Sequence, residues 1–237
     1  MKIEILFPEL STLYGDAGNI LYIKSCFNSE DITETHYQDK PLFAAERVDM
    51  IYIGSMTENN QLKAIEYLLP YKERLLELIE DGVVFLATGN AMELFGEYIA
   101  DDDNKWDALG IFPFYAKKKT EYCRHNCHFL GTFEGMNIVG YKSQFSFCYG
   151  DFKEPFIKVL GGYANNPEDS FEGIHHKNFF GTYVIGPLLP FNPPFAKYLF
   201  SLIGYEGKLS FEDDATEAYN YRLKHLKQDD VNFYPRH

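Results

Sequence analysis

The first part of the chain alternates short β-prone runs with segments of helical periodicity. The short runs, typical of strands in a sheet covered on both faces, are residues 3–7, 32–37, 50–54 and 83–87. Apolar positions recur at helical spacing in residues 20–27, 60–80 and 92–98. Pro70 predicts a kink or a break in the longest of these segments, and Gly82 predicts its end.

The second part of the chain has strand candidates joined by glycine-bearing turns. These candidates are residues 127–133, 137–141, 144–149, 159–163 and 181–185. Helical patterns follow at residues 194–203, after a cap and first turn at Asn192-Pro193, and at about 213–227. This series of short strands and glycine-bearing turns predicts an antiparallel or mixed extension of the sheet, followed by a C-terminal helix.

These patterns together predict the fold class. Repeated strand–helix alternation favours a three-layer α/β/α arrangement with a mostly parallel, doubly wound sheet and a small antiparallel extension. The chain contains no internal repeat, low-complexity tract or Gly/Ser linker. We therefore expect a single domain over residues 1–237.

Composition and charge exclude several classes of protein. An apolar content of 46%, with 21 Phe and 18 Tyr, predicts a folded globular chain. The net charge of −13 argues against nucleic acid as a partner, because phosphate would be repelled. We see no signal peptide and no membrane-spanning apolar stretch, so we expect a cytoplasmic protein with reduced thiols. Neither G-x-x-x-x-G-K-[ST] nor G-x-G-x-x-G occurs, and no cofactor is expected.

Loops at the carboxyl ends of parallel strands are where sites form in open α/β sheets. Three such loops are predicted, at residues 54–56, 88–90 and 186–187. The second has the position of a nucleophile elbow, but its apex is Gly89. Thr88 is the neighbouring hydroxyl, and no base lies near it in sequence to activate it.

Two further polar groups are candidate sites. Cys123, His125 and Cys127 would share one face of a strand and are weak candidates for metal ligands. No second Cys/His pair follows at zinc-finger spacing, so ordinary strand residues are favoured. The other group, expected to be a polar turn and a solvated face, contains Glu168, Asp169, Glu172, His175 and His176.

Two segments carry a resemblance to a known family. Residues 7–19 read FPELSTLYGDAGN, and residues 162–193 include GYANNPED and GTYVIGPLLPFNP. Over about residues 1–205 the chain resembles the GatD family of CobB/CobQ-type class I glutamine amidotransferases. The resemblance implies their fold and a role as the glutaminase subunit of lipid II isoglutaminyl synthase. In that family, ammonia passes to a Mur-ligase-like partner, MurT, which amidates the glutamate of the peptidoglycan stem peptide.

The resemblance also assigns positions within the site. The family's nucleophilic cysteine, in a C-G-G-Y-Q-like elbow, matches Gly89, and its basic histidine matches Ile185. Its E-N-H-x-G-R-like segment corresponds to residues 142–147, and a substrate-binding arginine aligns loosely with His128. The implied vestigial pocket contains Tyr14, Gly54, Ser55, Thr88, Asn90, Glu93, His128 and Gln144.

Two functions remain open from the sequence. Attack on the glutamine amide requires a thiolate and an imidazole, and neither matching position supplies one. The first hypothesis is a non-catalytic subunit that docks on a Mur-ligase-like synthetase or senses a small ligand in the vestigial pocket. The alternative is an active glutaminase with another thiol, Cys148 or Cys127, and with His128, His175 or His176 as its base.

Overall fold

The computed structural model describes residues 1–118, 124–228 and 232–234. The strands in these residues are β1 (Ile3–Leu6), β2 (Ile32–Thr35), β3 (Met50–Ile53), β4 (Val84–Thr88), β5 (Tyr98–Ala100), β6 (Lys105–Asp107), β7 (Phe114–Lys118), β8 (His125–Phe133), β9 (Met136–Gln144), β10 (Ser146–Gly150), β11 (Pro155–Gly161), β12 (Phe171–His176) and β13 (Phe179–Thr182). The α-helices are α1 (Asp16–Cys26), α2 (Glu58–Leu68), α3 (Lys72–Glu80), α4 (Leu188–Phe191), α5 (Pro193–Ser201) and α6 (Glu212–Leu226). The short 3-10 helices are η1 (Leu13–Gly15), η2 (Ser29–Asp31), η3 (Leu42–Ala44), η4 (Leu69–Tyr71) and η5 (Gly89–Phe95).

The larger sheet has the strand order β2-β1-β3-β4-β13-β12-β11-β8-β9. The neighbours from β2 to β13 are parallel, and those from β13 to β9 are antiparallel. A smaller sheet with the order β10-β7-β5-β6 lies beside it. The doubly wound parallel part is as predicted, and the antiparallel part is larger than the sequence pattern indicates.

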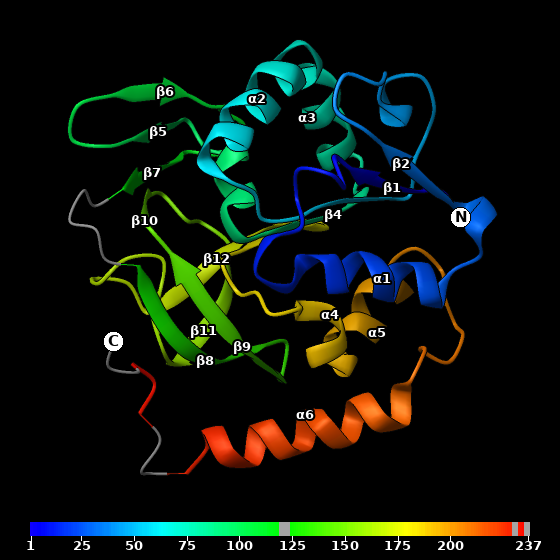
Figure 1. The fold of residues 1–237 in the computed structure, drawn as a ribbon, viewed down its shortest axis with the longest axis vertical. Helices are drawn as coiled ribbons and strands as arrows, with labels where there is room; N and C mark the ends of the chain where they lie inside the picture. Colours follow the sequence, from blue (N-terminus) through cyan, green and yellow to red (C-terminus); the bar gives the residue numbers. More distant parts are fainter. Residues whose placement is uncertain (119–123, 229–231, 235–237) are drawn as a thin grey trace.

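Helices cover both faces of the parallel strands (Figure 1). Successive side chains of a strand point to opposite faces. Ile51 and Ile53 of β3 belong to the core shared with α2 and α3, whereas Met50 and Tyr52 belong to the core shared with α1, α4 and α5. Both sets are buried, which explains why β3 is apolar at every position. The result is the three-layer arrangement that the sequence predicts.

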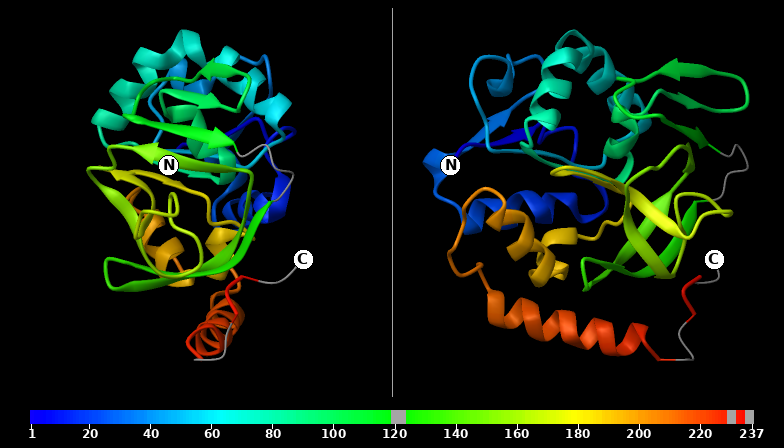
Figure 2. Two further views of the ribbon diagram at one scale, coloured as in Figure 1. Left: turned by 90° about the vertical axis from the view of Figure 1, so that its left-hand side faces the viewer. Right: turned by 180° about the vertical axis from the view of Figure 1, so that it is seen from behind.

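The C-terminal helix lies outside these layers. Figure 2 shows α6 running along the outer side of the layer that contains α4 and α5. A small separate cluster of Leu130, Val139 and Tyr219 joins α6 to β8 and β9. The Tyr219 hydroxyl also donates to the Asn137 carbonyl, at 3.0 Å.

The predicted helix at residues 92–98 is wrong. The chain forms the 3-10 helix η5, which ends at Phe95, and then enters β5 at Tyr98. Gly96 lies against the next strand, since a Cβ atom there would be 2.7 Å from the Phe114 carbonyl oxygen. The Glu97 amide donates to that same oxygen, at 2.7 Å. Pairing with β7 therefore overrides the helical spacing.

The predicted polar turn at residues 168–176 is wrong as well, because most of it is β12. Glu172 is fully buried between β11 and β13, where its carboxylate accepts hydrogen bonds from the Thr182 hydroxyl and the Tyr183 amide. Its charge pairs with Lys142 of β9, which is also fully buried, at 3.6 Å. The sequence suggests a solvated face here, but partners from other strands satisfy the buried charge.

Candidate functional site

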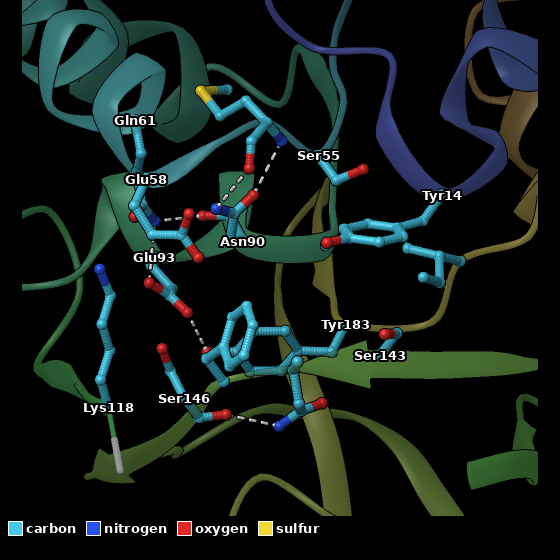
Figure 3. A pocket seen from close by; sticks show the side chains of 15 residues that line it. Tyr14, Ser55, Glu58, Gln61, Asn90, Glu93, Lys118, Ser143, Ser146 and Tyr183 are labelled. Atoms are coloured by element: carbon cyan, nitrogen blue, oxygen red, sulfur yellow. Dashed lines mark hydrogen bonds between the residues drawn. The ribbon is translucent and has the colours of Figure 1, made fainter. Parts of the chain in front are cut away.

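A small cavity lies at the carboxyl ends of the parallel strands, where β3 and β4 give way to loops (Figure 3). Its volume is about 30 Å³, room for about two water molecules. Its walls are η1 at Tyr14, the loop after β3, the start of α2, the turn after β4, and the junction of β9 with β10. The chain therefore brings together loops that are far apart in sequence.

Gly89 forms the sharp turn between β4 and η5. Its φ of 61° lies in the left-handed region that glycine adopts without strain. A Cβ atom placed on Gly89 would lie 3.5 Å from Ile185 Cγ2, so the two positions are neighbours. The same Cβ atom would lie only 2.5 Å from Ser55 Cβ. Ser55 thus fills the space in which a side chain at residue 89 would begin.

Ile185 lies beyond the end of β13, in an isolated antiparallel bridge with Tyr141 of β9. The Ile185 amide donates to the Tyr141 carbonyl at 2.9 Å, and the Tyr141 amide donates to the Ile185 carbonyl at 3.2 Å. This bridge fixes the Ile185 backbone beside the turn at Gly89. The side chain is buried and apolar, and it offers no group that could accept a proton.

Ser55 is held in place from two sides. Its amide donates to Asp16 Oδ2 at 2.6 Å, and its hydroxyl donates to the Leu13 carbonyl at 2.7 Å. Asp16 begins α1, is fully buried, and also accepts from Thr88 at 2.9 Å and from Asn19 at 3.0 Å. Burial raises the pKa of Asp16 to about 6, against the opposing effect of these hydrogen bonds.

Asn90 and Met56 close the wall next to Gly89. The Met56 amide donates to Asn90 Oδ1, and Asn90 Nδ2 donates to the Met56 carbonyl, both at 2.9 Å. Backbone N–H groups in such a loop can stabilise an oxyanion only when they are free to point at it. The Met56 N–H already donates to Asn90, which directly follows Gly89 in the turn, so it is not free to bind an oxyanion.

A buried polar chain forms the floor of the cavity. Glu93 of η5 accepts from Gln61 Nε2 at 2.8 Å and from the Tyr183 hydroxyl at 2.6 Å. The Tyr183 oxygen also contacts Cys148 Sγ at 3.1 Å. Because Tyr183 donates its proton to Glu93, the Cys148 thiol donates to Tyr183 and stays protonated. Burial raises the pKa of Glu93, and it raises the pKa of Cys148 well above its usual value.

The residues of the predicted vestigial pocket fall into two groups. Those that line the cavity are Tyr14, Ser55, Asn90, Glu93 and Gln144. Gly54 and Thr88 are buried outside the lining, and Thr88 supports the wall through Asp16. His128 is on the exposed side of β8, with its ring against Tyr141, and does not reach the cavity.

Sequence reasoning missed several lining residues. They are Glu58, Gln61, Lys118 and Tyr183, whereas Met56, Ser143, Phe145 and Ser146 lie in the predicted loop at 54–56 and the matched segment at 142–147. Glu58 and Gln61 are three residues apart and share a face of α2, a spacing that becomes informative only once the start of the helix is known. Tyr183 lies two residues before Ile185, and its polar role depends on Glu93 from another element.

The alternative thiols do not face the cavity. Cys127 and Cys148 are fully buried, and neither lines it. Cys127 accepts a hydrogen bond from the Tyr163 amide at 3.3 Å, and burial raises its pKa. A buried protonated thiol is a poor nucleophile. The geometry therefore gives no support to either cysteine as the nucleophile of a glutaminase.

The candidate metal ligands are only partly within the described residues. Cys123 lies outside them, whereas His125 and Cys127 are in β8. The described part of the chain contains no group of three His, Cys, Asp or Glu side chains arranged to hold a metal ion. No helix in the same described ranges is long and apolar enough to cross a membrane.

His175 and His176 lie at a second cavity, of about 320 Å³, beside α3. His176 Nε2 is 2.9 Å from Glu80, and Nδ1 is 2.9 Å from Glu154. Burial disfavours the charged imidazole, but the hydrogen bonds to the two carboxylates outweigh it and raise the pKa of His176. His176 therefore joins α3 to the loop before β11.

We expect His176→Gln to destabilise the protein more at pH 5.5 than at pH 8.5. A raised histidine pKa stabilises the folded state below the unfolded pKa, and this contribution is lost as the pH rises through the folded pKa. The partly exposed ion pairs limit the effect to less than about 1 kcal/mol. Urea unfolding at both pH values measures it, with the exposed His128→Gln as control. A loss that is larger at pH 8.5 would contradict this assignment.

The chain has clear relatives in sequence. It matches the CobB/CobQ-like glutamine amidotransferase domain over residues 2–193. It is 33% identical over 190 residues to the lipid II isoglutaminyl synthase (glutamine-hydrolyzing) subunit GatD of Staphylococcus aureus strain N315, covering 79% of this chain and 77% of the relative. It is 28% identical over 206 residues to the same subunit of Streptococcus pneumoniae strain ATCC BAA-255 / R6, with 81% and 76% covered.

Solved structures agree on the fold. A crystal structure of a glutamine amidotransferase has a TM-score of 0.59 and 11% identity, covering 86% of this chain and 100% of that chain. The structure of PurLQS from Thermotoga maritima has a TM-score of 0.55 and 14% identity, with 95% and 99% covered. Together with the sequence match, these findings mean that the chain belongs to the CobB/CobQ-like glutamine amidotransferase family and is GatD-like.

Proposed function

We propose that this chain is a glutamine amidotransferase-like subunit that does not hydrolyse glutamine. Its role is to dock on a Mur-ligase-like, MurT-like synthetase or to sense a small ligand, and its pathway is amidation of the peptidoglycan stem peptide. Residues 1–237 act as a single unit in this proposal. The observation that carries it is the turn at Gly89, which faces Ile185 and is filled by Ser55.

Glutamine hydrolysis by this family's chemistry needs a sulfur nucleophile and an imidazole base. At the two matching positions the chain has a glycine and an isoleucine, and the described lining of the cavity contains neither cysteine nor histidine. Loss of a nucleophile alone lowers the rate by about 10⁴–10⁶-fold in triad enzymes. The occupied Met56 N–H adds a further obstacle to stabilising an oxyanion.

The synthetase partner rests on similarity. Both GatD relatives are named as subunits of a glutamine-hydrolyzing lipid II isoglutaminyl synthase. Because the match extends over most of this chain, we infer a similar docking surface. A subunit of this kind would leave the synthetase dependent on ammonia from another source.

The test is ammonia release from L-glutamine by the purified chain, alone and with a co-expressed Mur-ligase-like partner. We expect a rate at least about 10³-fold below that of a GatD protein assayed in parallel. The complex should amidate its acceptor with ammonium chloride but not with glutamine alone. Ammonia release that disappears in Cys148→Ser or Cys127→Ser, but persists in the control Cys26→Ser, would overturn the proposal in favour of the alternative thiol.

A further inference from the structure

Strand β11 accompanies β8 along only part of its length. The pairing reaches Gly161 of β11, opposite Leu130 of β8, whereas β8 begins five residues earlier, at His125. The chain then turns away at Gly162, whose φ of 96° lies in the left-handed region that glycine adopts without strain. A Cβ atom on Gly162 would lie 2.5 Å from the His128 carbonyl oxygen, so the turn lies directly against β8. β11 therefore leaves the first part of this β8 edge to another segment of the chain.

Residues 232–234 lie along this edge, where the chain returns from α6 (Figure 1). The His128 amide donates to the Phe233 carbonyl at 2.9 Å, so the segment adds to β8 by its backbone. The Phe233 ring lies over Gly161, since a Cβ atom there would be 2.3 Å from the ring. The ring also packs against the small cluster that joins α6 to β8 and β9. The absence of a side chain at residue 161 thus makes room for the phenyl ring.

Tyr234 provides the second side-chain contact. Its hydroxyl donates to the Gly162 carbonyl at 3.0 Å, and its ring centroid is 4.8 Å from that of Tyr163. Within the described residues, two hydrogen bonds join residues 232–234 to the rest of the protein. Tyr234 is 47% exposed, and a cavity of about 380 Å³ remains beside the segment. A segment with few buried contacts and exposed hydrogen bonds opens locally at low cost.

We propose that His128, Gly161, Gly162 and Tyr163 form a groove that recognises an extended Phe-Tyr segment, and that residues 232–234 fill it as a reversible strap. Recognition combines a backbone hydrogen bond to a strand edge with places for particular side chains, as in strand addition. The occupant is the chain's own C-terminal segment, which its tether to α6 holds at a high effective concentration. None of the four groove residues lines the cavity at Gly89, so the inference does not depend on the loss of glutamine hydrolysis.

The experiment uses the full chain with Phe233→Ala and Tyr234→Ala, which empties the groove, and a peptide of residues 231–237, VNFYPRH, as the probe. The peptide should bind this variant saturably, with a Kd of about 0.1–1 mM. A strap that is closed about ten times as often as it is open, at an effective concentration in the millimolar range, has an affinity of this order. Calorimetry measures the binding, and the NMR shift of the His128 amide locates it. The wild type should bind about tenfold more weakly, because its own strap competes.

Gly161→Ala, added to the double variant, should weaken peptide binding at least tenfold, because its methyl group takes the place of the phenyl ring. Lys158→Ala, at an exposed position of β11, is the matched control and should bind normally. A peptide carrying Phe233→Ala has the same charge and should not bind. If the double variant does not fold, Phe233→Ala alone replaces it.

Four results would overturn the inference. The first is no saturable binding to the emptied groove, and the second is equal binding by the wild type and the emptied variant. The third is unchanged binding after Gly161→Ala. The fourth is equal binding of the peptide without its phenyl ring, which would mean that a cationic peptide is attracted only by the net charge of −13.

Discussion

Gly89→Cys combined with Ile185→His is expected to give glutaminase activity at least about 100-fold below that of an intact GatD protein. The two changes place a thiol at the elbow and an imidazole opposite it. They do not restore the space, because the new Cβ atom begins 2.5 Å from Ser55 Cβ. Ser55 cannot move away easily, since its amide and its hydroxyl are both hydrogen-bonded. Errors of about 1 Å in positioning can cost about 10²-fold in rate.

The decisive comparison adds Ser55→Gly to the double variant. Removing the Ser55 side chain should raise ammonia release at least about tenfold over the double variant, because the thiol can then reach its position. Ser143→Gly, which opens the cavity from another wall, is the matched control and should have no such effect. Near-normal turnover from the double variant alone would mean that Ser55 is no obstacle and that the cavity still binds glutamine well.

Stability provides an independent measure of the same overlap. Gly89→Ala should cost about 1–3 kcal/mol, as overpacked sites do, with a further penalty from its φ of 61°. The Ser55→Gly background should reduce this cost, because it removes the overlapping atom. Urea unfolding of the two single variants and the double variant gives the coupling energy. Additive costs would show that residues 55 and 89 do not interfere.

The parallel half of the fold follows closely from the sequence. Residues 50–54 and 83–87 are apolar at consecutive positions, and β3 and β4 are buried on both faces. Loops that follow such strands must meet at one edge of the sheet, which is why the turn at Gly89 and the loop at Ser55 could be predicted to lie together. Only the family resemblance predicts that Ile185 lies beside Gly89, because no local pattern links the two positions.

The antiparallel half depends on contacts that no local pattern reveals. Residues 144–149 read as one strand, but Phe145 separates β9 of the larger sheet from β10 of the smaller one. The charges of Lys142 and Glu172 suggest solvent, yet the two side chains are fully buried against each other. Satisfaction of a polar group by a distant partner is a tertiary property, and the same holds for Glu93 in the cavity.

Asp16 links the start of α1 to both loops of the site, so we expect its protonation to have a large effect on the free energy of unfolding. It is fully buried and accepts hydrogen bonds from Ser55, Thr88 and Asn19. Burial raises its pKa from 3.8 to about 6, so the folded protein holds this proton more tightly than the unfolded chain does. The stabilisation from that proton is complete only below about pH 3, under the unfolded pKa of 3.8, and is lost as the pH rises through 6.

The difference in unfolding free energy between the wild type and Asp16→Asn should therefore change with pH. Asparagine does not titrate, and the other ionisable groups cancel in the difference. The advantage of the wild type should fall by about 2.5 kcal/mol between pH 4 and pH 7.5, slightly less than the full free energy of a shift of about two pKa units, because the unfolded Asp16 is already partly ionised at pH 4. Urea unfolding across this range measures it, with the exposed Asp214→Asn as control. A difference that is constant, or that grows as the pH rises, would mean that Asp16 is ionised throughout and that its hydrogen bonds outweigh its burial.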